Sequence, residues 1–177
     1  MKTTVKMIGV LILLIVIYAV IALLAFGKTY HYEKSIVIGV PKEKVWQHVR
    51  TMKAVNEWNP WMKLDPDMKI TYTGEPGKKG DAYCWDSSND EAGAGCQQLL
   101  ELVLYKKQKS EMIFRKPFEG RAFSEIILVP EGNSTKVTWT METEQHPMMK
   151  MMRPLMDYQM GKSYGEGLEN LKKLAEK

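Results

Sequence analysis

The chain has 177 residues, with 25 Lys and Arg against 21 Asp and Glu, and a net charge of +4. Two of the lysines precede residue 27, so the rest of the chain carries 23 basic and 21 acidic side chains. Such a small excess, without a clustered basic stripe, excludes a typical nucleic-acid-binding surface. The length fits one domain and a short additional segment.

The first segment is typical of a membrane anchor. Residues 7–26 (MIGVLILLIVIYAVIALLAF) contain no charge, and about twenty such residues are needed to cross ~30 Å of hydrocarbon as a helix. A cleaved signal peptide is the alternative, because Ala25-Phe26-Gly27 loosely fits a cleavage site. The run is longer than the ~7–15 apolar residues of a signal sequence. We therefore expect a retained anchor over residues 1–29 and a domain over residues 30–177.

The lysines on both flanks of the anchor bear on its orientation. Lys2 and Lys6 favour a cytoplasmic amino terminus, whereas four lysines follow the apolar run, at positions 28, 34, 42 and 44. The positive-inside count is therefore almost balanced. The sequence favours a single-pass membrane protein whose domain lies on the extracytoplasmic side.

The domain begins with mixed elements and continues as strands. Alternating β-branched residues predict a strand over 30–40, and Pro41 starts a short helix that is followed by a second one over 54–61. Six further strands are predicted over 68–73, 82–86, 93–105, 109–117, 121–129 and 135–143. Their short connections require antiparallel pairing, because parallel strands need a crossover.

The pattern changes period at Pro147. Apolar residues then recur at steps of three and four, which predicts an amphipathic helix of nearly thirty residues. Pro154 lies inside it and predicts a kink or break after the first two turns. One antiparallel sheet with a long helix across it is an α+β architecture, and a strongly curved sheet of this kind often leaves a cavity beneath the helix.

Six segments in this order carry a family resemblance. They are residues 33–49 (EKSIVIGVPKEKVWQHV), 57–86 (EWNPWMKLDPDMKITYTGEPGKKGDAYCWD), 91–103 (EAGAGCQQLLELV), 117–120 (PFEG), 135–141 (TKVTWTM) and 165–176 (GEGLENLKKLAE). Together they resemble the START/SRPBCC superfamily, the helix-grip fold of the birch-pollen allergens, and most closely its bacterial polyketide cyclase/dehydrase branch. One departure is Gly39-Val40-Pro41, where the family has a small residue and Ala before Pro.

The resemblance implies a helix-grip fold: a curved antiparallel sheet of about seven strands wrapped on a long C-terminal helix, here preceded by one transmembrane helix. It also implies a hydrophobic cavity between sheet and helix that holds an apolar ligand. Because the superfamily includes carriers, receptors and enzymes, the fold does not define a chemistry.

The two cysteines, Cys84 and Cys96, do not have a metal-ligand spacing. They fall on neighbouring predicted strands, where a cross-strand disulfide is conceivable. Two buried thiols that act as small apolar groups are an equal alternative.

No catalytic constellation stands out. A nucleophile needs a base within ~2.6–3.2 Å, and the three histidines, His31, His48 and His146, lie on segments unrelated to the cysteines. We expect no catalytic residues, no metal and no cofactor.

Six of the sixteen residues in 146–161 (HPMMKMMRPLMDYQMG) are methionine. A Cu(I) tract, a membrane-facing surface and a cavity wall are possible interpretations. Met148, Met152, Met156 and Met160 recur at four-residue steps, which indicates one helix face toward the sheet, with Met149 and Met151 off that face. We predict that these four are buried beside a pocket and that Lys150, Arg153 and Asp157 are exposed.

Large apolar side chains are the remaining candidates for the cavity wall. The complete predicted set is Trp58, Trp61, Tyr72, Tyr83, Trp85, Trp139, Met141, Met148, Met152, Met156 and Met160. Glu125, Glu142 and Asn56 are candidate buried polar groups that could orient a ligand.

We therefore predict a membrane-anchored, non-catalytic protein that binds a lipid-like or other hydrophobic small molecule. Two alternatives stay open. An enzyme acting on an apolar substrate, such as a cyclase or dehydratase, would need a buried carboxylate of raised pKa in the cavity. An accessory module that docks on a membrane-protein partner would have a helix-to-sheet gap filled by side chains.

Overall fold

The computed structural model describes residues 2–177, without the side chains of residues 2, 3 and 5. The elements in chain order are α1 (Lys2–Ala25), β1 (Thr29–Ile38), α2 (Lys42–Gln47), α3 (Met52–Asn56), the 3-10 helix η1 (Pro60–Lys63), β2 (Lys69–Thr73), β3 (Ala82–Asp86), β4 (Ala94–Val103), β5 (Lys107–Lys116), β6 (Gly120–Glu131), β7 (Ser134–Glu144), α4 (Pro147–Met151) and α5 (Arg153–Ala175).

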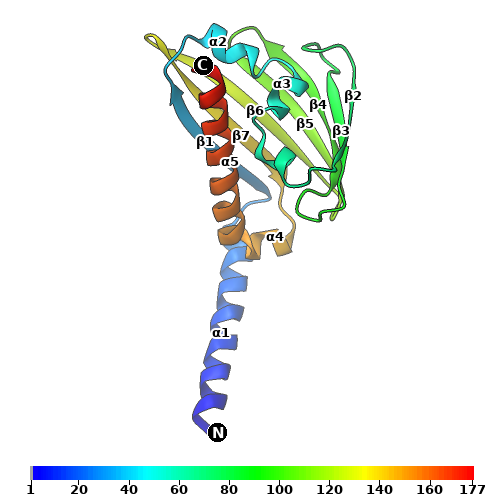
Figure 1. Cartoon of the computed structure of the whole chain (residues 1–177). Coiled ribbons are helices and arrows are strands. Elements are labelled where there is room, and N and C mark those ends of the chain that lie inside the picture. Colours follow the sequence, from blue (N-terminus) through cyan, green and yellow to red (C-terminus); the bar gives the residue numbers. More distant parts are fainter. Residues whose placement is uncertain (1) are drawn as a thin grey trace.

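The seven strands form one antiparallel sheet with the order β1-β7-β6-β5-β4-β3-β2. Only β1 leaves the sequential order, because it pairs with β7 at the sheet edge. The sheet curves around α5, which lies across its inner face (Figure 1). This arrangement confirms the predicted α+β helix-grip architecture, and each predicted strand is present within a few residues of its expected bounds.

The long C-terminal helix is divided, as Pro154 predicted. α4 ends at Met151. Met152, with φ of −89° and ψ of 4°, interrupts the helix, and α5 begins at Arg153. Pro154 occupies the first turn of α5, where its missing N–H requires no partner. The break makes α4 a separate element that can take its own direction.

The main core lies beneath the C-terminal half of α5. Leu168 and Leu171 pack there with Val45 of α2 and Val137 of β7, around the fully buried Trp58. Gly167 allows α5 to approach closely, because a Cβ at this position would lie 2.7 Å from the ring of Trp139. This half of the helix is therefore packed directly against the sheet.

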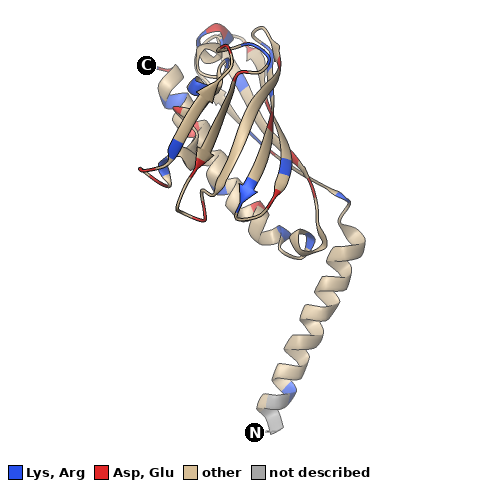
Figure 2. Ribbon diagram, turned by 90° about the vertical axis from the view of Figure 1, so that its right-hand side faces the viewer, with Lys and Arg blue, Asp and Glu red and all other residues tan. Residues whose placement is uncertain are grey.

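α1 leaves the domain at one end and meets α4 there. The phenol of Tyr18 donates to the carbonyl of Met151 at 3.0 Å, and the ammonium of Lys150 donates to the carbonyl of Phe26 at 2.7 Å. The guanidinium of Arg153 lies 4.6 Å from the centre of the Phe26 ring. The helix over Lys6–Ala25 is long and apolar enough to cross a membrane, and charged residues are concentrated on the domain rather than on it (Figure 2).

The strand directions define the end of the domain that faces α1, here called the anchor end. β1 starts there and β7 ends there, and the β3–β4 loop (residues 87–93) and the β5–β6 turn (residues 117–119) belong to the same end. α4 and the first turns of α5 complete it (Figure 1).

Candidate functional site: a cavity at the anchor end

A cavity of about 1140 Å³ lies between the inner face of the sheet and the N-terminal half of α5. Its wall includes residues of β3 to β7, η1, α4 and α5, and the β5–β6 turn of the anchor end forms part of its rim. The N-terminal half of α5 contacts the sheet at β1, where Tyr30 donates to Asp157 and Lys34 donates to the carbonyl of Gly161. The cavity lies between this half of the helix and the more distant strands of the sheet.

Aromatic side chains close the inner end of the cavity. Trp139 stacks on Tyr164 of α5 with 4.1 Å between ring centres, and Trp61 of η1 packs edge-on against both rings. The indole N–H of Trp139 donates to the hydroxyl of Ser124 at 2.9 Å. On the opposite wall, Tyr83 and Trp85 project from β3, since alternate residues of a strand share a face.

Methionines supply much of the remaining wall. The cavity is lined by the predicted Met141, Met148, Met152, Met156 and Met160, and also by Met62, Met68, Met112 and Met149. The thioether side chain is flexible and polarizable, so it adapts to contents of irregular shape.

The predicted burial of the methionine run is only partly correct. Met156 and Met160 are half-buried, but Met148 is 66% exposed and Met152 is 46% exposed, because α4 turns outward at the rim. Met149, placed off the sheet-facing side by a single continuous helix, lines the cavity because the break at Met152 changes the helix direction.

The predicted exposure of the charged residues in this run is also only partly correct. Asp157 is exposed, as expected. Lys150 and Arg153 are half-buried instead of exposed, because the ammonium and guanidinium groups lie against the end of α1.

Two predicted wall residues lie outside the cavity lining. Trp58 is fully buried in the main core, where its indole N–H donates to the carbonyl of His48 at 2.9 Å. Tyr72 is 43% exposed on the edge strand β2, and its hydroxyl accepts from the side-chain amide of Asn56. Alternation along a strand indicates two faces but cannot show that an edge strand lies beyond the helix.

The prediction of buried polar groups that orient a ligand was mostly wrong. Glu125 lies on the outer face of the sheet and pairs with Lys109 at 3.0 Å, and Glu142 is exposed. Asn56 is buried, as predicted, but it does not line the cavity.

The buried polar groups that do reach the cavity include Tyr83, Gln97, Ser124, Asn59 and Tyr164. The phenol of Tyr83 donates to Oε1 of Gln97 at 2.9 Å, and Nε2 of Gln97 donates to the hydroxyl of Ser110 at 2.7 Å. The adjacent Gln97 and Gln98 have the same side chain, so the sequence could not show which of the two points inward.

Burial also controls the titration of the cavity tyrosines. It raises the pKa of Tyr83 and of Tyr164 well above the ordinary value of a phenol. A neighbouring phenol, Tyr72, adds to the effect at Tyr83. Both side chains are therefore neutral hydrogen-bonding groups at physiological pH.

Among the residues that the structure describes, carboxylates meet the cavity only at its rim. Glu91, Glu119, Glu142 and Glu144 contribute to the lining, and all four are exposed. Within residues 2–177 as described, no three His, Cys, Asp or Glu side chains gather closely enough to hold a metal ion. His146, beside the methionine run, is exposed at the rim.

A second opening of about 450 Å³ lies at the side of α5. Trp61, Met160 and Glu91 line both this opening and the main cavity, and the side chains of Leu64 and Gln159 flank it. Trp61 and Met160 thus separate the main cavity from a lateral groove between η1 and α5.

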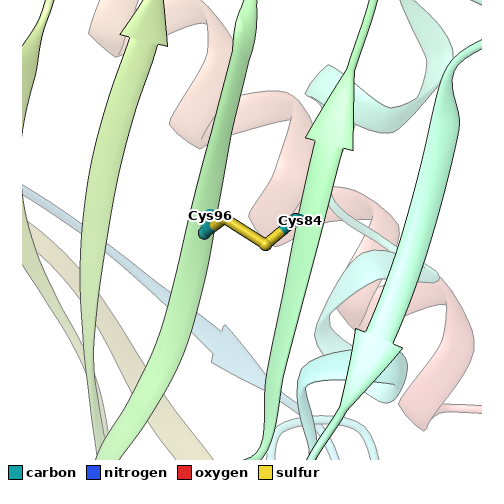
Figure 3. The surroundings of a disulfide bond; sticks show 2 residues. All are labelled: Cys84 and Cys96. Atoms are coloured by element: carbon teal, nitrogen blue, oxygen red, sulfur yellow. A yellow bond between two sulfur atoms is a disulfide. The ribbon is translucent and has the colours of Figure 1, made fainter.

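The cysteines form a disulfide on the face of the sheet opposite the cavity. Cys84 of β3 and Cys96 of β4 are direct cross-strand partners, with Cα atoms 4.0 Å apart (Figure 3). Their neighbours Tyr83, Trp85 and Gln97 point to the cavity face, so the sulfur atoms lie on the outer face. The disulfide interpretation of this pair is correct and that of two thiols is wrong.

The chain is similar to a known protein family and to several solved structures. A family model described as polyketide cyclase / dehydrase and lipid transport matches residues 29–176. No curated protein matches the chain in sequence.

Several solved structures share the fold. Truncated norcoclaurine synthase from Thalictrum flavum superposes with a TM-score of 0.65 at 15% identity, covering 82% of this chain and 92% of its own. A protein from Chromobacterium violaceum gives 0.59 at 16% identity, covering 85% and 98%. Ara h 8.0201 gives 0.57 at 13% identity, covering 83% and 97%. At such identities the likeness concerns the fold alone.

Proposed function

Because the chain belongs to the polyketide cyclase/dehydrase and lipid transport family, within the START/SRPBCC superfamily, we propose that it is a membrane-anchored binder of a lipid-like or other apolar small molecule. The observation that carries this proposal is the cavity of about 1140 Å³ between sheet and helix, with its aromatic and methionine walls.

The size and chemistry of the cavity support an apolar guest. Ligand pockets commonly measure about 300–1,000 Å³, so this cavity has room for a molecule of lipid or drug size. Trp85, Phe114 and Ile126 offer apolar surface, and the hydroxyl and amide groups of Tyr83 and Gln97 provide a few polar contacts that can orient a guest. We expect a largely apolar ligand with one or two hydrogen-bonding groups.

The first alternative is an enzyme acting on an apolar substrate. Norcoclaurine synthase shares the fold, and one of its structures contains dopamine and hydroxybenzaldehyde. Acid–base chemistry in a buried site needs a group of matched pKa within reach of the reacting atoms. Among the described residues, the carboxylates that line this cavity are exposed at the rim, which favours a binder over an acid–base catalyst.

The second alternative is an accessory module that docks on a membrane protein. This function would not need space between sheet and helix. The cavity favours a ligand-binding function, while the exposed surfaces of α1 can still contact a membrane-protein partner.

Three observations support the proposed location. α1 has the length and composition of a single-pass anchor, and the short connection between α1 and β1 keeps the cavity close to the bilayer. The disulfide between Cys84 and Cys96 supports an extracytoplasmic domain, because disulfides persist in oxidising compartments and are rare in the cytosol.

The test is native mass spectrometry of the full chain extracted in mild detergent, with identification of any bound molecule. We expect an apolar molecule at one copy per chain. The variant Ala122→Trp should lose it, because Ala122 is buried in the cavity wall and the indole would occupy the cavity. The matched control is Ile113→Trp, at a half-exposed position on the outer face, which should retain it.

Two results would contradict the proposal. One is wild-type protein that repeatedly carries no apolar molecule and takes up none from mixed lipid extracts. The other is Ala122→Trp protein that is folded and binds as well as the wild type.

A further inference from the structure

The rim of the cavity carries apolar side chains that no part of the domain covers. Phe118, at the tip of the β5–β6 turn, is 83% exposed, and Met148 of α4 is 66% exposed. Both line the cavity mouth. Burying such side chains is favourable by about 25 cal/mol for each Å² removed from water, so their joint exposure beside an opening indicates a contact surface.

The contacts of α4 with α1 show where the rim lies along the axis of α1. The carbonyl of Met151 accepts from Tyr18, and Ala22, one helical turn further along α1, is fully buried. Tyr18 precedes the end of α1 by about two helical turns, or ~10 Å along the axis. α4 therefore lies beside the last turns of the apolar helix rather than beyond its end.

A spanning α1 consequently brings the rim to the lipid surface. About twenty apolar residues are needed to cross the hydrocarbon, and the run ends near Phe26, whose carbonyl accepts from Lys150. An amphipathic helix at an interface buries its apolar face ~5–10 Å deep, with long basic side chains extending toward the headgroups. Met148 and Met151 with Lys150 give α4 this composition.

We propose that the anchor-end rim, formed by Phe118, Met148, Met151 and Met152, inserts into the bilayer that holds α1, so that the cavity opens into lipid rather than into water. This inference rests on the proposed membrane anchor and ligand cavity. The same bilayer is then the route by which an apolar ligand enters and leaves.

The contact is apolar rather than electrostatic. Charged side chains at the cavity mouth are Lys116, Arg121 and four glutamates, Glu91, Glu119, Glu142 and Glu144. Lys150 of α4 adds a third basic group, whose ammonium already donates to the carbonyl of Phe26. A mouth with more acidic than basic groups has no attraction for anionic headgroups. Insertion is therefore expected in a purely zwitterionic bilayer and should not increase with anionic lipid.

The experiment uses the full chain in nanodiscs that each hold a single copy. Phe118→Cys and Met148→Cys receive an environment-sensitive fluorophore, which labels one position because the native cysteines are paired. The matched control is Val129→Cys, an apolar position that is 47% exposed at the far end of β6. Quenching is measured with iodide in the water and with a nitroxide on the lipid acyl chain.

Insertion predicts a blue-shifted emission at positions 118 and 148, severalfold stronger quenching by the acyl-chain nitroxide than at position 129, and weak quenching by iodide. Equal iodide quenching at all three positions would overturn the proposal. Because each disc holds one chain, protection at the rim cannot come from a second copy.

A label could also be sheltered by the cavity itself. The measurement is therefore repeated with Ala122→Trp, in which the indole occupies the cavity. If the acyl-chain nitroxide still quenches the fluorophores at positions 118 and 148 in this variant, the rim is inserted in the bilayer. If the quenching disappears, the nitroxide-labelled lipid had reached the fluorophores from inside the cavity, and the insertion is wrong. If the rim stays in water while native mass spectrometry detects a bound apolar molecule, the insertion is wrong and the proposed function stands.

Discussion

The two halves of α5 meet the same sheet in different ways. In the C-terminal half, residues 164–175, Tyr164, Leu168, Leu171 and Ala175 are buried and Gly167 brings the helix close to Trp139. In the N-terminal half, residues 153–163, Met156 and Met160 are only half-buried, and Leu155 and Tyr158 are exposed. We call these the packed half and the open half.

The contrast separates two tasks along one helix. Close packing beneath the packed half stabilises the domain, because interior side chains fill space at nearly crystalline density. The open half leaves a volume that a ligand can fill, with side chains flexible enough to follow its shape. Substitutions in the packed half should therefore change stability, and those in the open half should change binding.

The largest expected effect comes from truncation in the packed half. Leu171 is fully buried, so Leu171→Ala should lower the free energy of unfolding by about 2–5 kcal/mol. The matched change Met156→Ala should cost less than about 1 kcal/mol, because part of that side chain already borders the cavity, but it should weaken ligand binding. Denaturant unfolding of the full chain in detergent, with ligand retention measured in parallel, tests both. Similar losses of stability would contradict the division of α5.

The next effect concerns the wall opposite the open half. There β3 and β4 receive little support from α5 and have only a small apolar cluster around Met52, Tyr83, Trp85 and Leu99. The Cys84–Cys96 disulfide closes a loop with a sequence separation of 12.

Replacing both cysteines by alanine should lower stability by about 2–4 kcal/mol, in line with short disulfide loops. Hydrogen exchange should show the loss of protection concentrated in β3 and β4. The α5 packed half serves as the internal control, and a uniform loss over both regions would contradict a local role of the disulfide.

A smaller effect distinguishes two glycines of α5. A Cβ at position 167 would approach the ring of Trp139 to 2.7 Å and Cδ of Pro60 to 3.1 Å, and neither group can move away easily. Gly167→Ala should therefore destabilise by about 1–3 kcal/mol despite the higher helix propensity of Ala.

Gly161→Ala is the matched control in the open half. Its Cβ would meet only the hydroxyl of Tyr32, at 3.2 Å, so the helix propensity of Ala should leave stability unchanged or higher by up to about 1 kcal/mol. Thermal unfolding compares the two variants, and a greater loss for Gly161→Ala would reverse the assignment of the halves.

The smallest effect is a pH dependence at the boundary of the halves. Burial raises the pKa of Tyr164 above the ordinary value near 10. The unfolded chain then loses the phenolic proton first, so the stability that this group contributes is intact below about pH 10 and is lost as the pH rises further.

Between pH 10 and 11, the wild type should lose about 1 kcal/mol through this phenol, and Tyr164→Phe should lose correspondingly less. Denaturant unfolding at closely spaced pH values measures the difference. Identical alkaline slopes for the two proteins would show that Tyr164 titrates normally in the folded state.

The sequence could predict the fold much better than the site. Alternation in strands and the three-to-four spacing after Pro147 are local signals, and the bounds of β3 were predicted to the residue because Gly80 and Ser87 flank a clear alternating segment. The position of Pro154 likewise revealed the interrupted helix.

The cavity depends on distances that local patterns do not contain. Trp58 and Trp61 both looked like wall residues, and both rings pack edge-on against Trp139. Only Trp61 lines the cavity, whereas Trp58 is fully buried in the main core. The outward direction of Met148 follows from the contact of α4 with α1, which joins segments more than 120 residues apart.

The direct attachment of α4 to the end of α1 fixes the position of the domain along the axis of α1. With α1 spanning the bilayer as proposed, a thinner bilayer is matched by tilting α1, and a thicker one by local thinning of the bilayer or by a shift of the residues that flank α1. Lys150 and Arg153 both contact Phe26 at the end of α1. The rim of the cavity must therefore move with α1 when α1 tilts or shifts. An apolar ligand should therefore enter the same cavity at different rates from membranes of different thickness, although the residues that line the cavity are unchanged.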